Sequence, residues 1–177
     1  TEALVAHVET LVVGDPMDEA TDVSALISTG ERDRVEAWIA EADAAGAAIA
    51  TGGRRQGDGV LMPTVITGAT PGMAVAREET FGPLAPLFRF RTEDEAIAMA
   101  NDTELGLAAY FYTRDLARAW RVSERLEYGM VGLNTGLIST EIAPFGGVKE
   151  SGIGREGSKY GIEDYLEMKY VCMAGVA

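Results

Sequence analysis

The chain has 177 residues, of which 47% are hydrophobic and 24% charged, as in an ordinary globular domain. Its 15 Lys and Arg stand against 28 Asp and Glu, for a formal net charge of -13. Nucleic-acid binding needs clustered cations, so this balance argues against it. No apolar run approaches the roughly 20 residues that cross a bilayer, and no signal-type leader opens the chain. We expect a soluble, cytoplasmic domain that binds neither nucleic acid nor membrane.

A single cysteine, Cys172, and a single histidine, His7, exclude further classes of function. One Cys cannot form an internal disulfide or a multi-Cys metal site, and one His cannot supply a zinc site of several His ligands. A Ser-His-Asp triad would have to use His7, which lies in a helical pattern. We interpret both residues as structural and predict no metal site.

The first half of the chain predicts two helices and three extended segments. Apolar residues at helical spacing open the chain, and Gly14-Asp15-Pro16 ends that helix. Ser28 begins a Ser-x-x-Glu capping box, which predicts a second helix that ends at Gly46. The extended segments are expected at 47–50, 61–66 and 73–76.

The second half alternates strand and helix. Strands are expected at 87–90, 107–112 and 130–133. One helix opens at the capping box of Thr92, and another runs over 115–128 with a core face of Leu116, Trp120 and Leu126. Short links between such elements predict parallel strands with right-handed crossovers, and the apolar strand from 107 predicts cover on both faces. The expected fold class is α/β, with an open, doubly wound parallel sheet.

Ligands of such sheets bind beyond the carboxyl ends of the strands. This rule points at residues 134–140, which follow the last predicted strand. The later segment 165–171 is rich in β-formers. It is interpreted either as a strand donated to another subunit or as an edge strand of the same domain.

Residues 152–157 match the pattern Gly-x-Gly-x-x-Gly. A dinucleotide fingerprint needs a strand just before it and a helix just after it, so that phosphate meets the amide groups of the helix N-terminus. Here the preceding residues, 146–151, are typical of a loop. We therefore predict no phosphate site at these glycines.

Two further motifs, EETFGPL at 78–84 and PFGGVKESGIGREG at 144–157, would each be read alone as a turn. Together, at this separation, they resemble the aldehyde dehydrogenase superfamily. Residues 136–171 resemble the succinate-semialdehyde dehydrogenases, and the resemblance runs along essentially the whole chain. Both motifs are long, so a chance match is improbable.

The resemblance implies that the catalytic groups lie outside this chain. In this family a Cys thiolate attacks the aldehyde, hydride passes to NAD(P), and a Glu-activated water hydrolyses the thioester. The nucleophile and the base are expected N-terminal to Thr1, and Cys172 does not match the nucleophile's motif. No catalytic residue is therefore expected in this chain. It resembles the C-terminal part of the catalytic domain, 1–160, with an oligomerisation tail at 161–177, so the N-terminal part of the same enzyme and further copies in a homo-oligomer are the expected partners.

The resemblance also assigns four site residues. Glu79 matches the carboxylate that binds the nicotinamide ribose, and Phe81 the aromatic packed near the nicotinamide. Ser139 matches the Ser that binds the distal carboxylate of succinate semialdehyde, and Phe145 an aromatic of the substrate channel. The choice between NAD and NADP stays open, as do two alternatives: a dehydrogenase for glutarate semialdehyde or an aromatic aldehyde, and a non-catalytic assembly module.

Overall fold

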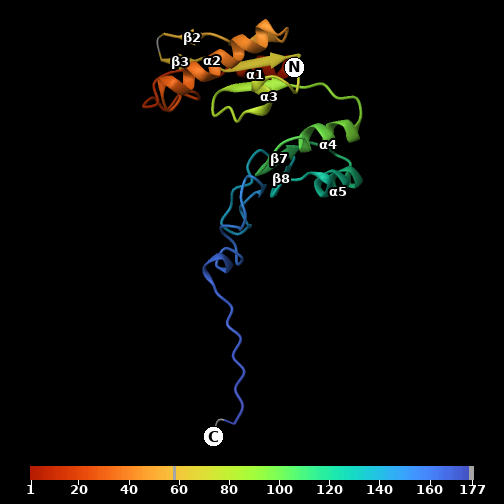
Figure 1. Ribbon diagram of the computed structural model, residues 1–177. Helices are drawn as coiled ribbons and strands as arrows, with labels where there is room; N and C mark the ends of the chain where they lie inside the picture. The colour runs from red at the N-terminus through yellow and green to blue at the C-terminus, as the bar shows by residue number, and fades with distance from the viewer. Residues whose placement is uncertain (58, 176–177) are drawn as a thin grey trace. The chain divides into compact units, whose positions relative to one another are not determined.

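The computed structural model describes residues 1–57 and 59–175, which form two compact units, Thr1–Phe90 and Arg91–Ala177 (Figure 1). The first unit contains α1 (Glu2–Val8), α2 (Thr29–Ala44), β1 (Ala48–Thr51), β2 (Arg55–Gln56), β3 (Val60–Leu61), β4 (Thr64–Thr67), α3 (Ala74–Arg77) and β5 (Leu84–Leu87). The second contains α4 (Glu93–Asn101), β6 (Leu105–Gly106), β7 (Ala108–Phe111), α5 (Leu116–Arg125), β8 (Met130–Leu133), β9 (Val148–Lys149) and the 3-10 helix η1 (Glu163–Tyr165).

The first unit packs α2 against a small mixed sheet. The strand order is β1-β4-β5, with β4 antiparallel to β1 and parallel to β5. The Ser28 hydroxyl accepts a hydrogen bond from the Glu31 amide at 3.2 Å and caps α2, as the capping box predicts. Val35 and Ile39 on α2 are buried with Leu61 and Ile66. Full burial of a side chain such as Leu61 contributes about 1.5–3 kcal/mol, so this cluster is the core of the unit.

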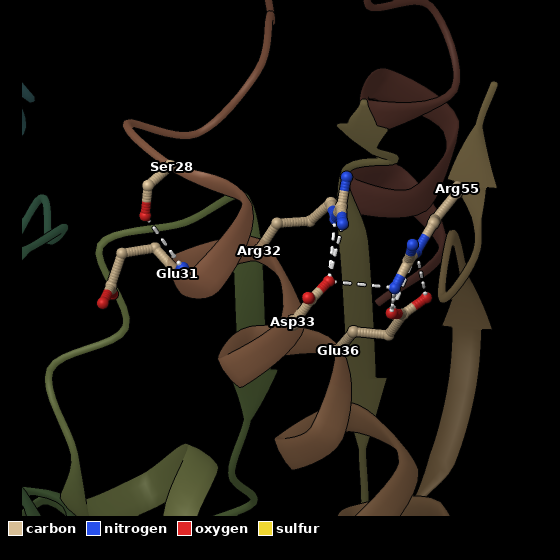
Figure 2. A network of polar contacts seen from close by, with 6 residues as sticks. All are labelled: Ser28, Glu31, Arg32, Asp33, Glu36 and Arg55. Atoms are coloured by element: carbon tan, nitrogen blue, oxygen red, sulfur yellow. Dashed lines mark hydrogen bonds and ion pairs between the residues drawn. The ribbon is translucent and has the colours of Figure 1, made fainter. Parts of the chain in front are cut away.

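A polar network ties the β2–β3 hairpin to α2 (Figure 2). Asp33 Oδ1 lies 2.7 Å from Arg32 Nη2 and 3.0 Å from Arg55 Nη2, and Arg55 also pairs with Glu36. Arg32 is buried, and a buried guanidinium requires a charged partner. The hydrogen bond from Arg32 lowers the pKa of Asp33, and that from Arg55 lowers the pKa of Glu36. Both carboxylates therefore stay ionised and hold the hairpin.

The second unit is built around the parallel pair β7–β8, with Phe111 opposite Leu133 in the register. Helix α5 connects the two strands, and the Asp115 carboxylate caps it by accepting from the Arg118 amide at 3.0 Å. The short strand β6 precedes β7 in the sequence and the short strand β9 follows β8, and these two strands pair antiparallel with each other. The predicted parallel pairing across a helix is confirmed for β7 and β8. The strand before α4 does not join them, because β5 pairs with β4.

The α/β class is thus confirmed, but the predicted all-parallel sheet is wrong in its details. The described strands form one three-stranded mixed sheet and three two-stranded pairs, and β1 runs antiparallel to β4. The strand predicted at 87–90 lies instead at Leu84–Leu87, where Thr64 pairs with Leu84. Long-range pairing of this kind decides strand bounds and leaves no local sequence signal.

The segment predicted as a strand at 73–76 is helical. Met73 is the N-cap of the short helix α3, and Arg77 Nε donates to the Pro71 carbonyl at 2.8 Å. Short apolar runs fit either a strand or a buried helical turn, because their period cannot be read. In the helical turn Val75 is buried, so the apolar character of this segment is explained without a strand.

Two burial predictions are wrong as well. Leu116 and Trp120 on α5 are 73% and 66% exposed, while the smaller Ala119 and Val122 on the adjacent face are buried. Strand β7 is not covered on both faces, since Tyr110 is 48% exposed. Apolar spacing predicts that a helix has an apolar side, but more than one side of α5 carries apolar residues.

The segment after η1 is not an edge strand of this domain. Residues 166–171 have neither helix nor strand assignment, and most of their apolar side chains are exposed. The edge-strand interpretation is therefore wrong for the described chain. Donation of this segment to another subunit stays a prediction, as does a boundary between a catalytic domain at 1–160 and a tail at 161–177.

Candidate functional site

The turn at 78–83 joins α3 to β5 and presents Glu79 and Phe81. Arg34 of α2 donates to the Thr80 carbonyl at 3.1 Å, which fixes the backbone between these two residues. Gly82 lies so close to Val35 that an added Cβ would come within 3.2 Å of it. The turn is therefore held by its backbone on the core side. The side chains of Glu79 and Phe81 remain outside the core, and both are exposed.

Phe81 has an unusual backbone conformation. Its φ is +44°, and its side chain is 76% exposed. A bulky residue rarely adopts positive φ, and such conformations persist where the surrounding structure enforces them. Here the contacts of the neighbouring residues Thr80 and Gly82 with α2 hold Phe81 in this conformation. The result is an aromatic face and a carboxylate presented two residues apart, suited to binding a ring and a pair of hydroxyl groups.

Ser139 lies in the second unit, on the loop that follows β8. The end of β8 is the carboxyl end of the parallel pair β7–β8, which is where ligands of parallel sheets bind, and a ligand at this loop stays a prediction. Ser139 itself is exposed. Its neighbour Ile138 folds back over β8, where a Cβ on Gly132 would lie 3.0 Å from it. Ile138 thus packs the loop against β8, and the next residue, Ser139, faces solvent.

Phe145 is half-buried and lines a cavity of about 690 Å³ within the second unit. It forms an antiparallel bridge with Glu156, in which the amide of each residue donates to the carbonyl of the other at 2.9 and 2.7 Å. Arg155 Nη1 donates to the carbonyls of Gly147 and Gly154 at 2.8 and 2.6 Å. These contacts fold the PFGG motif onto the glycine-rich segment and fix the ring in the cavity wall.

The Gly-x-Gly-x-x-Gly pattern has a structural explanation in this fold. Gly152, Gly154 and Gly157 adopt φ of +113°, +89° and +64°, conformations that favour glycine. Only turns separate them from η1 at Glu163, so no helix begins at the pattern. An added Cβ on Gly154 would also overlap the Asp164 carboxylate. The glycines serve the turn geometry. The preceding segment was predicted as a loop but contains the short strand β9, so the missing helix is what separates this pattern from a dinucleotide fingerprint.

His7 lies in the last turn of α1, and Cys172 is exposed and outside any helix or strand. Across residues 1–57 and 59–175, no three His, Cys, Asp or Glu side chains cluster closely enough to hold a metal ion. Within the same residues, no helix combines the length and hydropathy needed to cross a membrane.

The four predicted site residues fall in two places. Glu79 and Phe81 share the anchored turn of the first unit, while Ser139 and Phe145 belong to the second unit. The sequence interpretation included Asn134 in the segment 134–140 but gave it no role of its own. It opens the Ser139 loop with φ of +55°. Its signal was present, because Asn is one of the few residues that tolerate this conformation directly after a predicted strand.

Comparison with known proteins gives a match over nearly the whole chain. The model described as "Aldehyde dehydrogenase family" matches residues 1–171. The glutarate-semialdehyde dehydrogenase of Pseudomonas putida is 55% identical, over 98% of this chain and 36% of its own length. The NADP(+) succinate-semialdehyde dehydrogenase of Escherichia coli is 54% identical, over 97% and 36%. The crystal structure of succinate-semialdehyde dehydrogenase from Burkholderia pseudomallei superposes with a TM-score of 0.94 at 57% identity, over 98% and 36%.

The chain thus spans 36% of the length of each of these proteins. What these matches establish is the family and its α/β fold. They do not bear out the narrower prediction that the chain is the C-terminal part of the catalytic domain.

Proposed function

Because the chain belongs to the aldehyde dehydrogenase family, we propose that it is part of an NAD(P)-dependent oxidoreductase that oxidises succinate semialdehyde to succinate. The observation that carries the proposal is the exposed Ser139 on the anchored loop at the carboxyl end of β8. The names of relatives support it, because both glutarate semialdehyde and succinate semialdehyde carry a carboxylate at the end distal to the aldehyde.

The substrate-binding role falls to the second unit. The Ser139 hydroxyl donates a hydrogen bond to the distal carboxylate of the substrate, and such bonds to charged groups are stronger than those to neutral ones. The Phe145 ring lines the channel that receives the aliphatic part of the substrate. Its position in the cavity wall, held by the bridge to Glu156, fits this role.

The cofactor-binding role falls to the turn of the first unit. The exposed Glu79 carboxylate can accept from two adjacent ribose hydroxyls, and the exposed Phe81 ring can pack against a flat heterocycle. These groups fit a nicotinamide nucleotide, and the name of one relative includes NADP(+). When bound, NAD(P) supplies the hydride acceptor. The contribution of this turn is to orient the ring, since Thr80 is held by Arg34 from α2.

The nucleophilic Cys and the general base Glu of the reaction belong to the part of the enzyme outside these 177 residues. The cysteine of this chain, Cys172, is exposed in an extended segment without helix or strand. A thiolate nucleophile is favoured at a helix N-terminus or beside a cation, and Cys172 lies at no helix N-terminus. The residues of this chain therefore bind and orient. A cytoplasmic location and a homo-oligomer completed by residues 161–177 stay predictions.

A substrate panel on the full-length enzyme tests the proposal. Steady-state kinetics would compare succinate semialdehyde, glutarate semialdehyde, butanal and benzaldehyde. We expect the highest kcat/KM on succinate semialdehyde, and a far lower value on butanal, which has the same length and no carboxylate. A maximum on glutarate semialdehyde would favour the activity named for the Pseudomonas relative. An equal or higher value on butanal or benzaldehyde would contradict a carboxylate-binding site.

A second candidate function is non-catalytic assembly through the segment 166–171, favoured by the exposure of Leu166, Met168 and Tyr170 without any strand pairing in the described chain. Size-exclusion chromatography with light scattering would compare the chain with a version shortened at residue 165. An oligomer that dissociates on shortening would support assembly, and a monomer in both cases would contradict it.

A further inference from the structure

Asn134 occupies a junction that the substrate-binding roles above leave unexplained. It is the first residue after β8, and its backbone amide donates to the Phe111 carbonyl of β7 at 3.0 Å. This bond continues the parallel ladder by one residue. At Asn134 itself the backbone turns away, because its φ is +55°.

The side chain of Asn134 then replaces the backbone in the ladder. Its Oδ1 accepts from the Thr113 amide at 2.9 Å, and its Nδ2 donates to the Thr113 carbonyl at 2.8 Å. A side-chain amide has the same donor and acceptor as a peptide group. The pairing of the two strands therefore extends to Thr113, although the main chain has already left the sheet. Few other side chains combine this donor–acceptor pair with tolerance of positive φ.

Beyond this clamp the loop has two further supports. The Ile138 side chain packs over Gly132, which has no Cβ to block it. The Glu141 carbonyl accepts a hydrogen bond from the Ser158 amide at 2.8 Å. Ser139 lies between these two supports and is exposed. The direction in which the loop leaves β8 thus decides where the Ser139 hydroxyl lies.

We propose that Asn134 is a positioning residue for substrate recognition: its side chain clamps the departure of the 135–143 loop from the sheet and so holds Ser139 in place. The proposal rests on the proposed function, in which Ser139 binds the distal carboxylate. Asn134 itself does not contact the substrate. Its loss acts through loop mobility and therefore affects the binding of a carboxylated aldehyde more than the binding of an uncharged one.

The test uses the full-length enzyme with Asn134→Gly, which keeps the left-handed backbone accessible and removes both side-chain hydrogen bonds. Asn101→Ala is a matched control. Asn101 makes the same kind of two-bond contact, to the Arg125 carbonyl at 2.8 Å and the Glu127 amide at 2.9 Å, away from the loop in sequence. Hydrogen exchange of peptides covering 135–143 and steady-state kinetics on succinate semialdehyde and butanal would be measured for both variants.

We expect Asn134→Gly to speed exchange in 135–143 by about tenfold or more, as the loss of two hydrogen bonds of ordinary strength implies. KM for succinate semialdehyde rises several-fold more than KM for butanal, with kcat less affected. Asn101→Ala leaves exchange in 135–143 unchanged. Exchange at the wild-type rate in Asn134→Gly overturns the clamp.

The two proposals fail in different ways. Faster exchange with equal loss on both aldehydes supports the clamp and contradicts the role of Ser139 in the proposed function. If Asn134→Gly does not fold, Asn134→Asp gives the same test, because it keeps the acceptor for the Thr113 amide and sets an oxygen against the Thr113 carbonyl. Wild-type exchange in Asn134→Asp, with unchanged KM values, overturns the clamp as well.

Discussion

Gly129 lies directly against Gly146: a Cβ built on Gly129 would overlap the Gly146 carbonyl oxygen. Gly129 immediately precedes β8, and Gly146 follows Phe145 in the cavity wall. This close backbone approach joins the strand that leads to Ser139 to the motif that carries Phe145. The two elements proposed to bind the substrate therefore share one contact that only glycine allows.

We expect Gly129→Ala to lower the free energy of unfolding by about 3 kcal/mol, because the overlap is with backbone that cannot move aside cheaply. Urea denaturation of the chain measures it. Gly72→Ala is the control, since a Cβ there meets nothing within 4 Å, and it should change stability by less than about 0.5 kcal/mol. Equal losses in the two variants would show that the contact with Gly146 is not the cause.

An ion-pair cluster between α4 and α5 gives a pH prediction. The Arg121 and Arg118 guanidinium groups hydrogen-bond Glu93 at 2.6 and 2.9 Å, and they lower the pKa of Glu93 from 4.5 to about 2. A carboxylate whose pKa is lower in the folded state stabilises the fold above its unfolded pKa, and this contribution is lost as pH falls through the folded pKa. The contribution of Glu93 is therefore complete above pH 4.5 and decays toward about pH 2.

We expect Glu93→Gln to lower Tm at pH 7, with a difference from wild type that shrinks between about pH 4.5 and pH 2 and also shrinks at high salt. Thermal denaturation over this range measures it. Glu124→Gln, at an exposed position on α5, makes the same change in charge and serves as the control. A Tm difference for Glu93→Gln that does not depend on pH would exclude the ion pairs as its source.

Much of the local structure could be predicted because its causes are local. The Ser28 and Thr92 hydroxyls accept from the amides of Glu31 and Glu95, as their capping boxes require. Strand β8 has the predicted bounds, Met130–Leu133, since its apolar run begins directly after Gly129. What failed depends on distant partners. The strand at Leu84–Leu87 takes its bounds from pairing with β4, about 20 residues earlier in the chain.

The candidate site could likewise be predicted only in part. Topology placed a ligand segment after Leu133, because the carboxyl ends of parallel strands gather ligands, and Ser139 lies there. The roles of Glu79, Phe81, Ser139 and Phe145 came from a resemblance and stay proposals. The clamp by Asn134 was missed, since its partner Thr113 lies on another strand and only the folded pairing brings the two together.

For the cofactor turn we expect Glu79→Gln, in the full-length enzyme, to slow the hydride step by between about 10- and 100-fold, because a less firmly held ring misplaces the reacting atoms. Stopped-flow measurement of NAD(P)H formation, with deuterated and ordinary aldehyde, reports this step. Glu78→Gln changes the adjacent exposed acid and should leave the rate unchanged. A wild-type rate with an intact isotope effect in Glu79→Gln would remove Glu79 from the cofactor site.

For the substrate loop we expect Ser139→Ala, in the full-length enzyme, to weaken the binding of succinate semialdehyde by about 1–3 kcal/mol, since the lost hydrogen-bond partner is charged. The loss should be much smaller on butanal, which offers no carboxylate to Ser139. Steady-state kinetics on the two aldehydes measures the difference. Thr140→Ala removes the neighbouring exposed hydroxyl and is the matched control. Because the two substrates have the same length, an equal loss on both would mean that Ser139 shapes the loop and does not bind the carboxylate.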